Sequence, residues 1–423
     1  MVSMPTPSVI RWVAPALFAA AILHTFSTKF FERRAHARPA HAGIWHLLGE
    51  VEVVFGFWAI VLAVAMFAVD GAAATTRYFD SRDLSEPMFV FAIMVIAATR
   101  PILQTAVTVV RLIARALPLP GSLGFYVAAM IACPLLGSFL TEPAAMTLAA
   151  LMLSGRIFSR GISDRLKYAS LGVLFVNVSI GGTLTPFAAP PVLMVAGKWG
   201  WDLSFMLTAF GAKAVAAVMV NSLGVALVFS KELARLPTTA TDPDAVPAPR
   251  ALVAVHLALL AGVVVFARHP VIFMGIFLLF LAVAHAYERH QDRLILREGL
   301  LVAIFLAGLV MLGGQQEWWL RPALASMTSS AVFFGAAALT AITDNASLTY
   351  LGSLVHGLSA EFKYALVAGA VSGGGLTIIA NAPNPAGIAI LRGHFKDETV
   401  NPVGLLLAAL PPTVVAMMAF RYL

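Results

Sequence analysis

Residues 141–147 read TEPAAMT, and residues 343–349 read TDNASLT. Both heptapeptides begin and end with threonine, carry an acid in second place and have alanine in fourth place. Further along, residues 181–191 (GGTLTPFAAPP) match residues 373–383 (GGGLTIIANAP) in the same order. Two matches in the same order are hard to attribute to chance, so the sequence predicts an internal duplication.

Glycine and proline at corresponding positions of the second match interrupt an otherwise helical segment in each half. Interrupted hydrophobic segments at equivalent places of two halves are the best sequence indication of a transporter binding site. The acidic heptapeptides lie between paired apolar segments, so we expect the backbone to turn there. Such a turn is tolerated at membrane depth only where it is buried in protein or lines a wet cavity.

The composition places the chain in a membrane. Of its 423 residues 60% are apolar and only 12% are charged, against about 25% in a soluble protein. Its mean hydropathy is +0.88, and apolar stretches long enough to cross about 30 Å of hydrocarbon recur throughout. The sequence therefore predicts an all-α polytopic membrane protein and excludes an ordinary soluble enzyme.

The expected topology has about ten crossings and two re-entrant hairpins. Two crossings are expected at residues 44–67 and 88–110, with an amphipathic helix at 101–117 extending the second. Cations in the loops close to the membrane favour two external termini and two repeats of inverted orientation. The predicted parts are a first repeat (1–233, with a hairpin at 122–158 and a broken helix at 166–197), a cytoplasmic linker (234–249) and a second repeat (250–423, with a hairpin at 323–358 and a broken helix at 363–392).

Several functions and partners lack support. The 28 Lys and Arg residues behind the net charge of +7 are spread between apolar runs, which argues against nucleic acid. Cys133 is the only cysteine, so neither a disulfide within the chain nor a cysteine metal cluster can form. No zinc-protease, nucleophile-elbow or Walker A motif is present. We expect no enzyme activity and no cofactor.

The acidic residues of the two heptapeptides are candidate ion ligands. A charged side chain at the bilayer centre costs about 2.5–3.5 kcal/mol, so Asp344 and Glu142 are functional candidates. Thr343 and Asn345 add uncharged oxygens beside Asp344, which suits a small hard cation such as Na⁺. The alternative is that each acid merely stabilises the start of the following helix.

The helix breaks offer neutral ligands. Thr185, Asn381 and Asn384 carry hydroxyl and amide groups next to prolines that keep the backbone open. The alternative is a pair of proline kinks whose polar side chains only pack helices.

Three further ionisable residues lie in apolar segments. Lys213 would be costly unpaired, and we expect it to match an acid such as Glu142, Glu50 or Glu52. It could carry a proton or form a structural ion pair. Glu50 and Glu52 are two residues apart and do not share a helix face, so at most one points at a given partner.

The motifs TDNASLT and NAPNPAG (residues 381–387) resemble those of a sodium/proton antiporter family in the ion transporter superfamily, which is related to arsenite permeases and dicarboxylate carriers. The resemblance implies inverted repeats, frequent dimerisation and an elevator-like motion. It implies that Thr343, Asp344, Asn345, Asn381 and Asn384 surround the ion, with Thr141, Glu142 and Thr185 opposite. The dicarboxylate carriers have neutral hairpin tips, whereas acids here would repel a carboxylate.

The sequence thus favours a secondary carrier of a bacterial inner membrane that exchanges Na⁺ or another monovalent cation for H⁺. Asp344 and Glu142 would bind the metal ion and the proton in turn. The first alternative is an anion carrier for arsenite or an organic acid, which would need a positive side chain such as Lys213 or Arg100 at the site. The second is a membrane scaffold that transports nothing.

Overall fold

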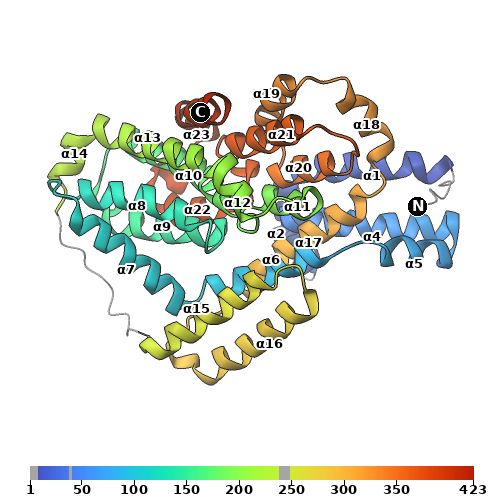
Figure 1. The fold of residues 1–423 in the computed structure, drawn as a ribbon, viewed down its shortest axis with the longest axis horizontal. Helices are drawn as coiled ribbons and strands as arrows, with labels where there is room; N and C mark the ends of the chain where they lie inside the picture. The colour runs from blue at the N-terminus through green and yellow to red at the C-terminus, as the bar shows by residue number, and fades with distance from the viewer. Residues whose placement is uncertain (1–7, 38–40, 238–247) are drawn as a thin grey trace. The chain divides into compact units, whose positions relative to one another are not determined.

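The computed structural model describes residues 8–37, 41–237 and 248–423. Within these ranges the regular structure is helical and includes no strand (Figure 1). This confirms the all-α class. Residues 238–247 of the predicted linker lie outside the described ranges. The helices form two compact units: Met1–Ala92 with Ile295–Ser326 and Tyr350–Leu358, and Ile93–Leu294 with Met327–Thr349 and Ser359–Leu423.

The first unit packs α4 against both α1 and α17. Glycine makes the α4 to α17 contact close, because a Cβ atom on Gly308 would lie 2.3 Å from the backbone of Phe55. The helices of this unit are α1 (Ser8–Thr25), α2 (Thr28–Ala37), α3 (Ala42–Gly49), α4 (Val51–Asp70), α5 (Ala72–Asp80), α17 (Leu296–Gly313) and α18 (Glu317–Ala325).

The crossing predicted at residues 44–67 is two helices and not one. Glu50 has an extended backbone and separates α3 from α4, and its carboxylate forms an ion pair with Arg297 at the start of α17. The prediction was wrong here because apolar residues flank Glu50 on both sides, while its partner is 247 residues away.

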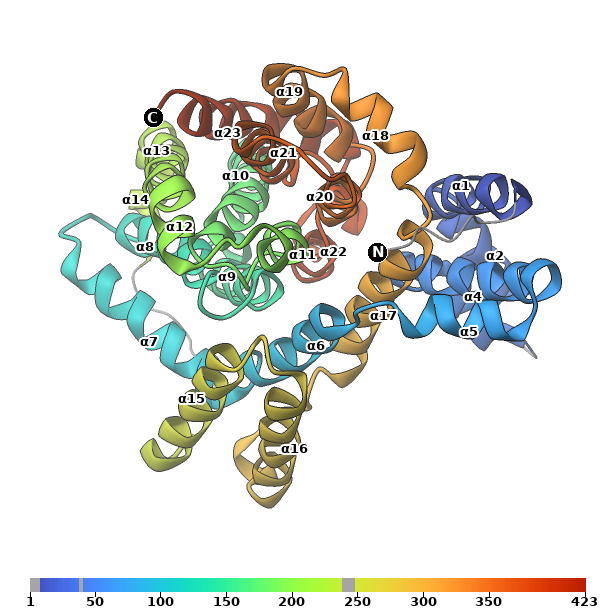
Figure 2. The same ribbon diagram turned by 45° about the vertical axis from the view of Figure 1, so that its right-hand side comes forward.

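The second unit holds both sets of repeated motifs. In it α10 packs against α8, α13 and α23, while α19 packs against α21 and α15 against α16 (Figure 2). Its helices are α7 (Arg100–Ala116), α8 (Leu123–Leu136), α9 (Glu142–Arg156), α10 (Asp164–Gly181), α11 (Pro190–Trp199), α12 (Leu203–Met206), α13 (Ala212–Val228), α14 (Ser230–Arg235), α15 (Arg250–Val265), α16 (Pro270–Ala286), α19 (Ser329–Thr340), α21 (Ala360–Gly373), α22 (Asn384–Leu391) and α23 (Pro402–Tyr422). Two helices run across the boundary between the units, α6 (Ser85–Ala97) and α20 (Asn345–Ser353).

Each acidic heptapeptide follows a short helix and starts another. The pairs are α8 with α9, and α19 with α20, each separated by a few non-helical residues. The longest of these four helices has 15 residues, about 22 Å, which is short of the ~30 Å hydrocarbon core. The glycine and proline motifs also interrupt helices: η3 (Gly182–Leu184) separates α10 from α11, and η6 (Ile378–Ala380) separates α21 from α22.

The crossing predicted at residues 88–110 ends earlier than expected. α6 stops at Ala97, and α7 leaves it at an angle of 67°. Thr99 is extended and Pro101 has no amide hydrogen to give to the preceding turn. The amphipathic helix expected at 101–117 is present as α7, with Ile102, Ala106 and Val110 buried at every fourth position.

Four helical segments are long and apolar enough to cross a membrane, and the bent pair α6 and α7 could add a fifth. These four are α4, α17, α23 and the segment Leu203–Val228, in which a π-helical turn, η4 (Leu207–Gly211), joins α12 to α13. Shorter apolar helices include α1, α8, α15, α16 and α19. The chain is therefore polytopic, and the count of ten crossings stays a prediction.

The contact between α10 and α23 depends on Gly172. A Cβ atom there would lie 2.6 Å from the backbone carbonyl of Ala408, which cannot move aside as a side chain can. We expect Gly172→Ala to destabilise the protein by about 1–3 kcal/mol through overpacking. Thermal unfolding of the purified protein measures this. Gly224→Ala on α13 is the matched control, because a Cβ atom at Gly224 meets nothing within 4 Å, and an equal loss in both variants would contradict the prediction.

Candidate functional site

Glu142 is the centre of the candidate site in the second unit. It is the first residue of α9, and its side chain is completely buried. One carboxylate oxygen, Oε2, accepts a hydrogen bond of 2.8 Å from the Nδ2 amide of Asn381, while Oε1 has no hydrogen-bond partner among the described residues. Thr141, not Glu142, caps α9 through its hydroxyl oxygen, which accepts from the amide of Ala144. Helix capping therefore does not account for Glu142.

The first helix break closes around this carboxyl group. A Cβ atom on Gly182 would lie 2.7 Å from Oε1 of Glu142, so glycine is needed for the approach of the two groups. The Ser138 hydroxyl donates to the carbonyl of Gly181 at 2.6 Å and accepts from the amide of Leu184 at 2.9 Å. Thr185 donates to the Ser138 carbonyl at 2.6 Å. These bonds fix the break against the turn that precedes α9.

The second helix break supplies two amides. Asn381 and Asn384 are buried where the chain passes from η6 into α22, and the Asn384 amide group donates to the carbonyls of Gly374 and Thr377 at 2.8 and 2.9 Å. In the part of the chain that the structure describes, however, the carbonyl oxygens of both side chains have no hydrogen-bond partner. α22 packs against α9, which brings this break to Glu142.

Asn345 joins the same cluster from the start of α20. Its Nδ2 amide lies 3.5 Å from the Ser179 hydroxyl, which itself donates to the carbonyl of Val371 at 2.8 Å. A Cβ atom on Gly374 would lie 2.1 Å from that hydroxyl and 2.9 Å from the Asn345 amide. Asn345 and Asn384 therefore meet at the backbone of Gly374. Within residues 8–37, 41–237 and 248–423, the Asn345 carbonyl oxygen also has no hydrogen-bond partner.

Four buried oxygens in one connected cluster thus accept no hydrogen bond within the described ranges. They belong to Glu142, Asn345, Asn381 and Asn384, each at most 1% exposed. Leaving a buried acceptor unsatisfied costs about 1–3 kcal/mol, so such groups need an explanation. Carboxylate and amide oxygens are ligands of hard cations. The arrangement can hold a cation, or a proton on the carboxyl group.

Asp344 has a partly structural role. Its Oδ1 accepts from the backbone amides of Ala346 and Ser347 at 2.8 and 3.2 Å, which is the capping arrangement considered as an alternative from the sequence. The side chain is only partly buried. Thr343 precedes it in the non-helical turn. Helix capping therefore accounts for Asp344, whereas it does not account for Glu142.

The remaining sequence candidates lie elsewhere. Lys213 donates to the Tyr364 hydroxyl at 2.9 Å. The sequence predicted an acidic residue as its partner. That hydroxyl can accept because its own proton goes to the carbonyl of Phe420 at 2.7 Å. Glu50 and Glu52 belong to the first unit, where Glu50 pairs with Arg297.

Sequence reasoning missed Ser138 and gave Ser179 no place in the site. Both serines are fully buried and connect the helix breaks to their surroundings. The only signal was a small polar residue inside an apolar segment, which is too common in membrane helices to single out a site.

Comparison with known proteins identifies the family. No curated protein matches the chain. The crystal structure of the YdaH transporter from Alcanivorax borkumensis resembles it with 15% sequence identity and a TM-score of 0.49, covering 88% of this chain and 96% of that one. A family model described as "Putative Na+/H+ antiporter" matches residues 9–423. Because that match spans nearly the whole chain, the protein belongs to this antiporter family and is a membrane transporter rather than an enzyme.

Proposed function

We propose that the protein exchanges Na⁺ for H⁺ across a bacterial inner membrane and that both ions bind in turn at Glu142. One observation carries the proposal: a fully buried carboxylate oxygen without a hydrogen-bond partner belongs to the same cluster as three amide oxygens in the same condition. Asn345, Asn381 and Asn384 would supply neutral ligands to the metal ion, and Thr141, Thr185, Thr343 and Asp344 would shape the site.

Burial explains why the two ions would be coupled. An ionised carboxylate without a counter-charge is costly in a low dielectric, so Glu142 is stable only when a cation or a proton neutralises it. The Asn381 amide holds one oxygen in place and leaves the other for either ion. Because one carboxyl group cannot hold both, the release of one ion requires the arrival of the other.

An anion carrier is less well supported. Such a carrier would need a positive side chain facing the site, yet Lys213 is bonded to Tyr364 and Arg100 to Asp292. Within the described residues, no lysine or arginine forms an ion pair or hydrogen bond with Glu142, Asn345, Asn381 or Asn384. A scaffold that transports nothing would leave four buried acceptors unexplained.

The repeated architecture supports an alternating-access mechanism in which the two halves are inverted. We extend the proposal to an elevator-like motion, to two external termini and to a homodimer in the lipid bilayer, as the family resemblance implies. The matched helix breaks favour a moving site, because each half contributes one interrupted helix to it.

The proposal is tested by proton flux in reconstituted vesicles. Purified protein is placed in vesicles that contain a pH-sensitive dye, and Na⁺, Li⁺, K⁺ and choline are added in turn. We expect the internal pH to change with Na⁺ and not with choline. Flux that does not depend on the added cation would reject the exchange, and flux that needs arsenite or an organic acid would favour the anion carrier.

Asp344→Asn distinguishes the helix-capping role of Asp344 from the effect of its negative charge on ion binding. Asparagine keeps the helix cap, so we expect the free energy of unfolding to change by less than about 0.5 kcal/mol. Loss of the charge should raise the Na⁺ concentration for half-maximal flux by about tenfold, as expected for a change of about 1.4 kcal/mol. The control is Asp344→Ala, which should also lose about 1 kcal/mol of stability. Wild-type Na⁺ dependence in Asp344→Asn would limit Asp344 to capping.

A further inference from the structure

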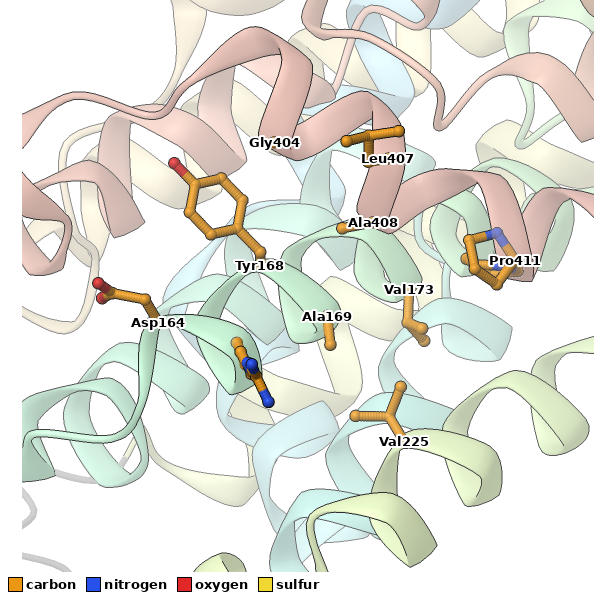
Figure 3. Close-up of a pocket in the computed structure, with 11 residues that line it drawn as sticks. Asp164, Tyr168, Ala169, Val173, Val225, Gly404, Leu407, Ala408 and Pro411 are labelled. Atoms are coloured by element: carbon orange, nitrogen blue, oxygen red, sulfur yellow. The ribbon is translucent and has the colours of Figure 1, made fainter.

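A groove lies beside α10, away from the residues that would hold the ion. This open groove of about 530 Å³ runs between α10, α13 and α23 (Figure 3). Its walls are almost entirely apolar, and a few polar residues stand at one end. Its lining includes Arg165, Tyr168 and Ala169 on α10 and Gly404, Ala408 and Pro411 on α23.

Small side chains create the groove. Ala169 on α10 and Gly404 and Ala408 on α23 all line it, and a Cβ atom on Gly404 would lie 2.9 Å from the Tyr168 ring. Pro411 lies at the end away from Asp164 (Figure 3). The two helices touch where Gly172 meets Ala408, so the space beside them cannot close by a simple approach of the helices. α23 is apolar and long enough to cross a membrane. Because the groove walls are almost entirely apolar, the groove suits an acyl chain better than water.

One positive charge at the polar end of the groove has no acidic partner within the described ranges. The Asp164 carboxylate pairs with the Lys167 ammonium group at 2.8 Å. The exposed Arg165 has no ion pair or hydrogen bond within the described ranges. Tyr168 accepts a hydrogen bond of 3.0 Å from the backbone amide of Asn401, so its own hydroxyl proton is not used in that bond. A guanidinium group and a phenol O–H donor are thus available beside an apolar groove.

We propose that this groove binds one anionic phospholipid of the surrounding membrane, with an acyl chain along Ala169 and Ala408 and the phosphate at Arg165 and Tyr168. Charge complementarity supports this occupant, because arginine binds phosphate with charge-assisted hydrogen bonds and basic pockets between membrane helices bind anionic headgroups. The lipid site is independent of the proposed ion exchange.

The test counts the lipids that stay bound to the purified full-length protein. The protein in detergent is incubated with equal amounts of phosphatidylglycerol and phosphatidylcholine that carry identical acyl chains, and native mass spectrometry measures what remains bound. One arginine near a headgroup predicts a preference of about fivefold for the anionic lipid. Arg165→Gln should remove this preference, and Ala169→Phe should reduce binding of both lipids because it fills the apolar groove.

Lys231→Gln is the matched control. Lys231 lies on α14, and its neighbour Glu232 binds Ser163 just before α10, so the control removes one charge from the same end of the unit without touching the groove. We expect Lys231→Gln to retain the wild-type preference. Equal retention of the two lipids by wild type, or an unchanged preference in Arg165→Gln, would overturn the proposal. It would also be overturned if Ala169→Phe changed the oligomeric mass and left lipid retention unchanged, because the occupant would then be a second copy.

Discussion

Glu142→Gln is expected to abolish cation-dependent proton flux. Glutamine has nearly the shape of the protonated acid, and its carbonyl oxygen can still accept from Asn381. It can neither release a proton nor neutralise a cation. A charge without a counter-charge at membrane depth costs about 2.5–3.5 kcal/mol. A loss of this size corresponds to a decrease in cation-dependent flux of about 100-fold or more. Flux in vesicles and cation binding by calorimetry both measure it.

The fold should survive this substitution. The variant places no charge in the buried site, so we expect its thermal stability to equal or exceed that of the wild type. The matched control is Glu361→Gln, an identical substitution at an exposed position in the first turn of α21. It should leave flux unchanged. If Glu142→Gln still coupled proton movement to Na⁺, another group would have to carry the proton, and the proposed mechanism would fail.

Gly182→Ala is expected to disable the site because it adds one methyl group against the Glu142 side chain. The added Cβ atom would lie 2.7 Å from Oε1 and 2.8 Å from Cγ of Glu142, closer than real contacts allow. Because the carboxyl group is buried and held by Asn381, it cannot swing into solvent. We expect the Na⁺ concentration for half-maximal flux to rise at least about tenfold, together with a loss of about 1–3 kcal/mol in stability from overpacking.

The control for this change is Gly155→Ala. Gly155 lies on α9, the same helix as Glu142, and a Cβ atom there meets nothing within 4 Å. Because Gly155 is the penultimate residue of α9, this substitution should change stability by less than about 1 kcal/mol and leave flux unchanged. If Gly182→Ala transported normally, the carboxyl group would have room to rearrange, and the tight approach seen at Gly182 would not matter for function.

The helix breaks could be predicted from the sequence because their causes are local. Glycine and proline interrupt α10 and α21 at the motifs themselves. The partners of isolated charges could not be predicted, since they depend on which helices meet. Glu50 pairs with Arg297, and Lys213 contacts Tyr364, which is 151 residues away and is not an acid. Apolar periodicity carries no information about such pairs.

Part of the site could likewise be predicted from the sequence, and part could not. The sequence singled out Glu142, Asn381 and Asn384, which the structure brings together. It proposed Asp344 as an ion ligand because a charge at the bilayer centre is costly, but the two backbone amides that this carboxylate caps lower that cost locally. The contacts of the two helix breaks show partial symmetry: Thr185 donates to the carbonyl of Ser138, and Thr377 donates to that of Ala341. The asparagines occur only in the second break, so the oxygen ligands are unequally shared.

The π-helical turn at Leu207–Gly211 lets the segment Leu203–Val228 accommodate a residue more than a regular α-helix of the same rise. Each residue of an α-helix turns the chain by about 100°, so an uncompensated insertion would rotate one end relative to the other. The wider turn absorbs that rotation. Beyond the turn, Asn221 donates from its amide to Asn177 at 3.0 Å, and before the turn Phe205 stacks on Trp201. In this segment, the number of residues can therefore change without changing the direction in which the side chains at its two ends point.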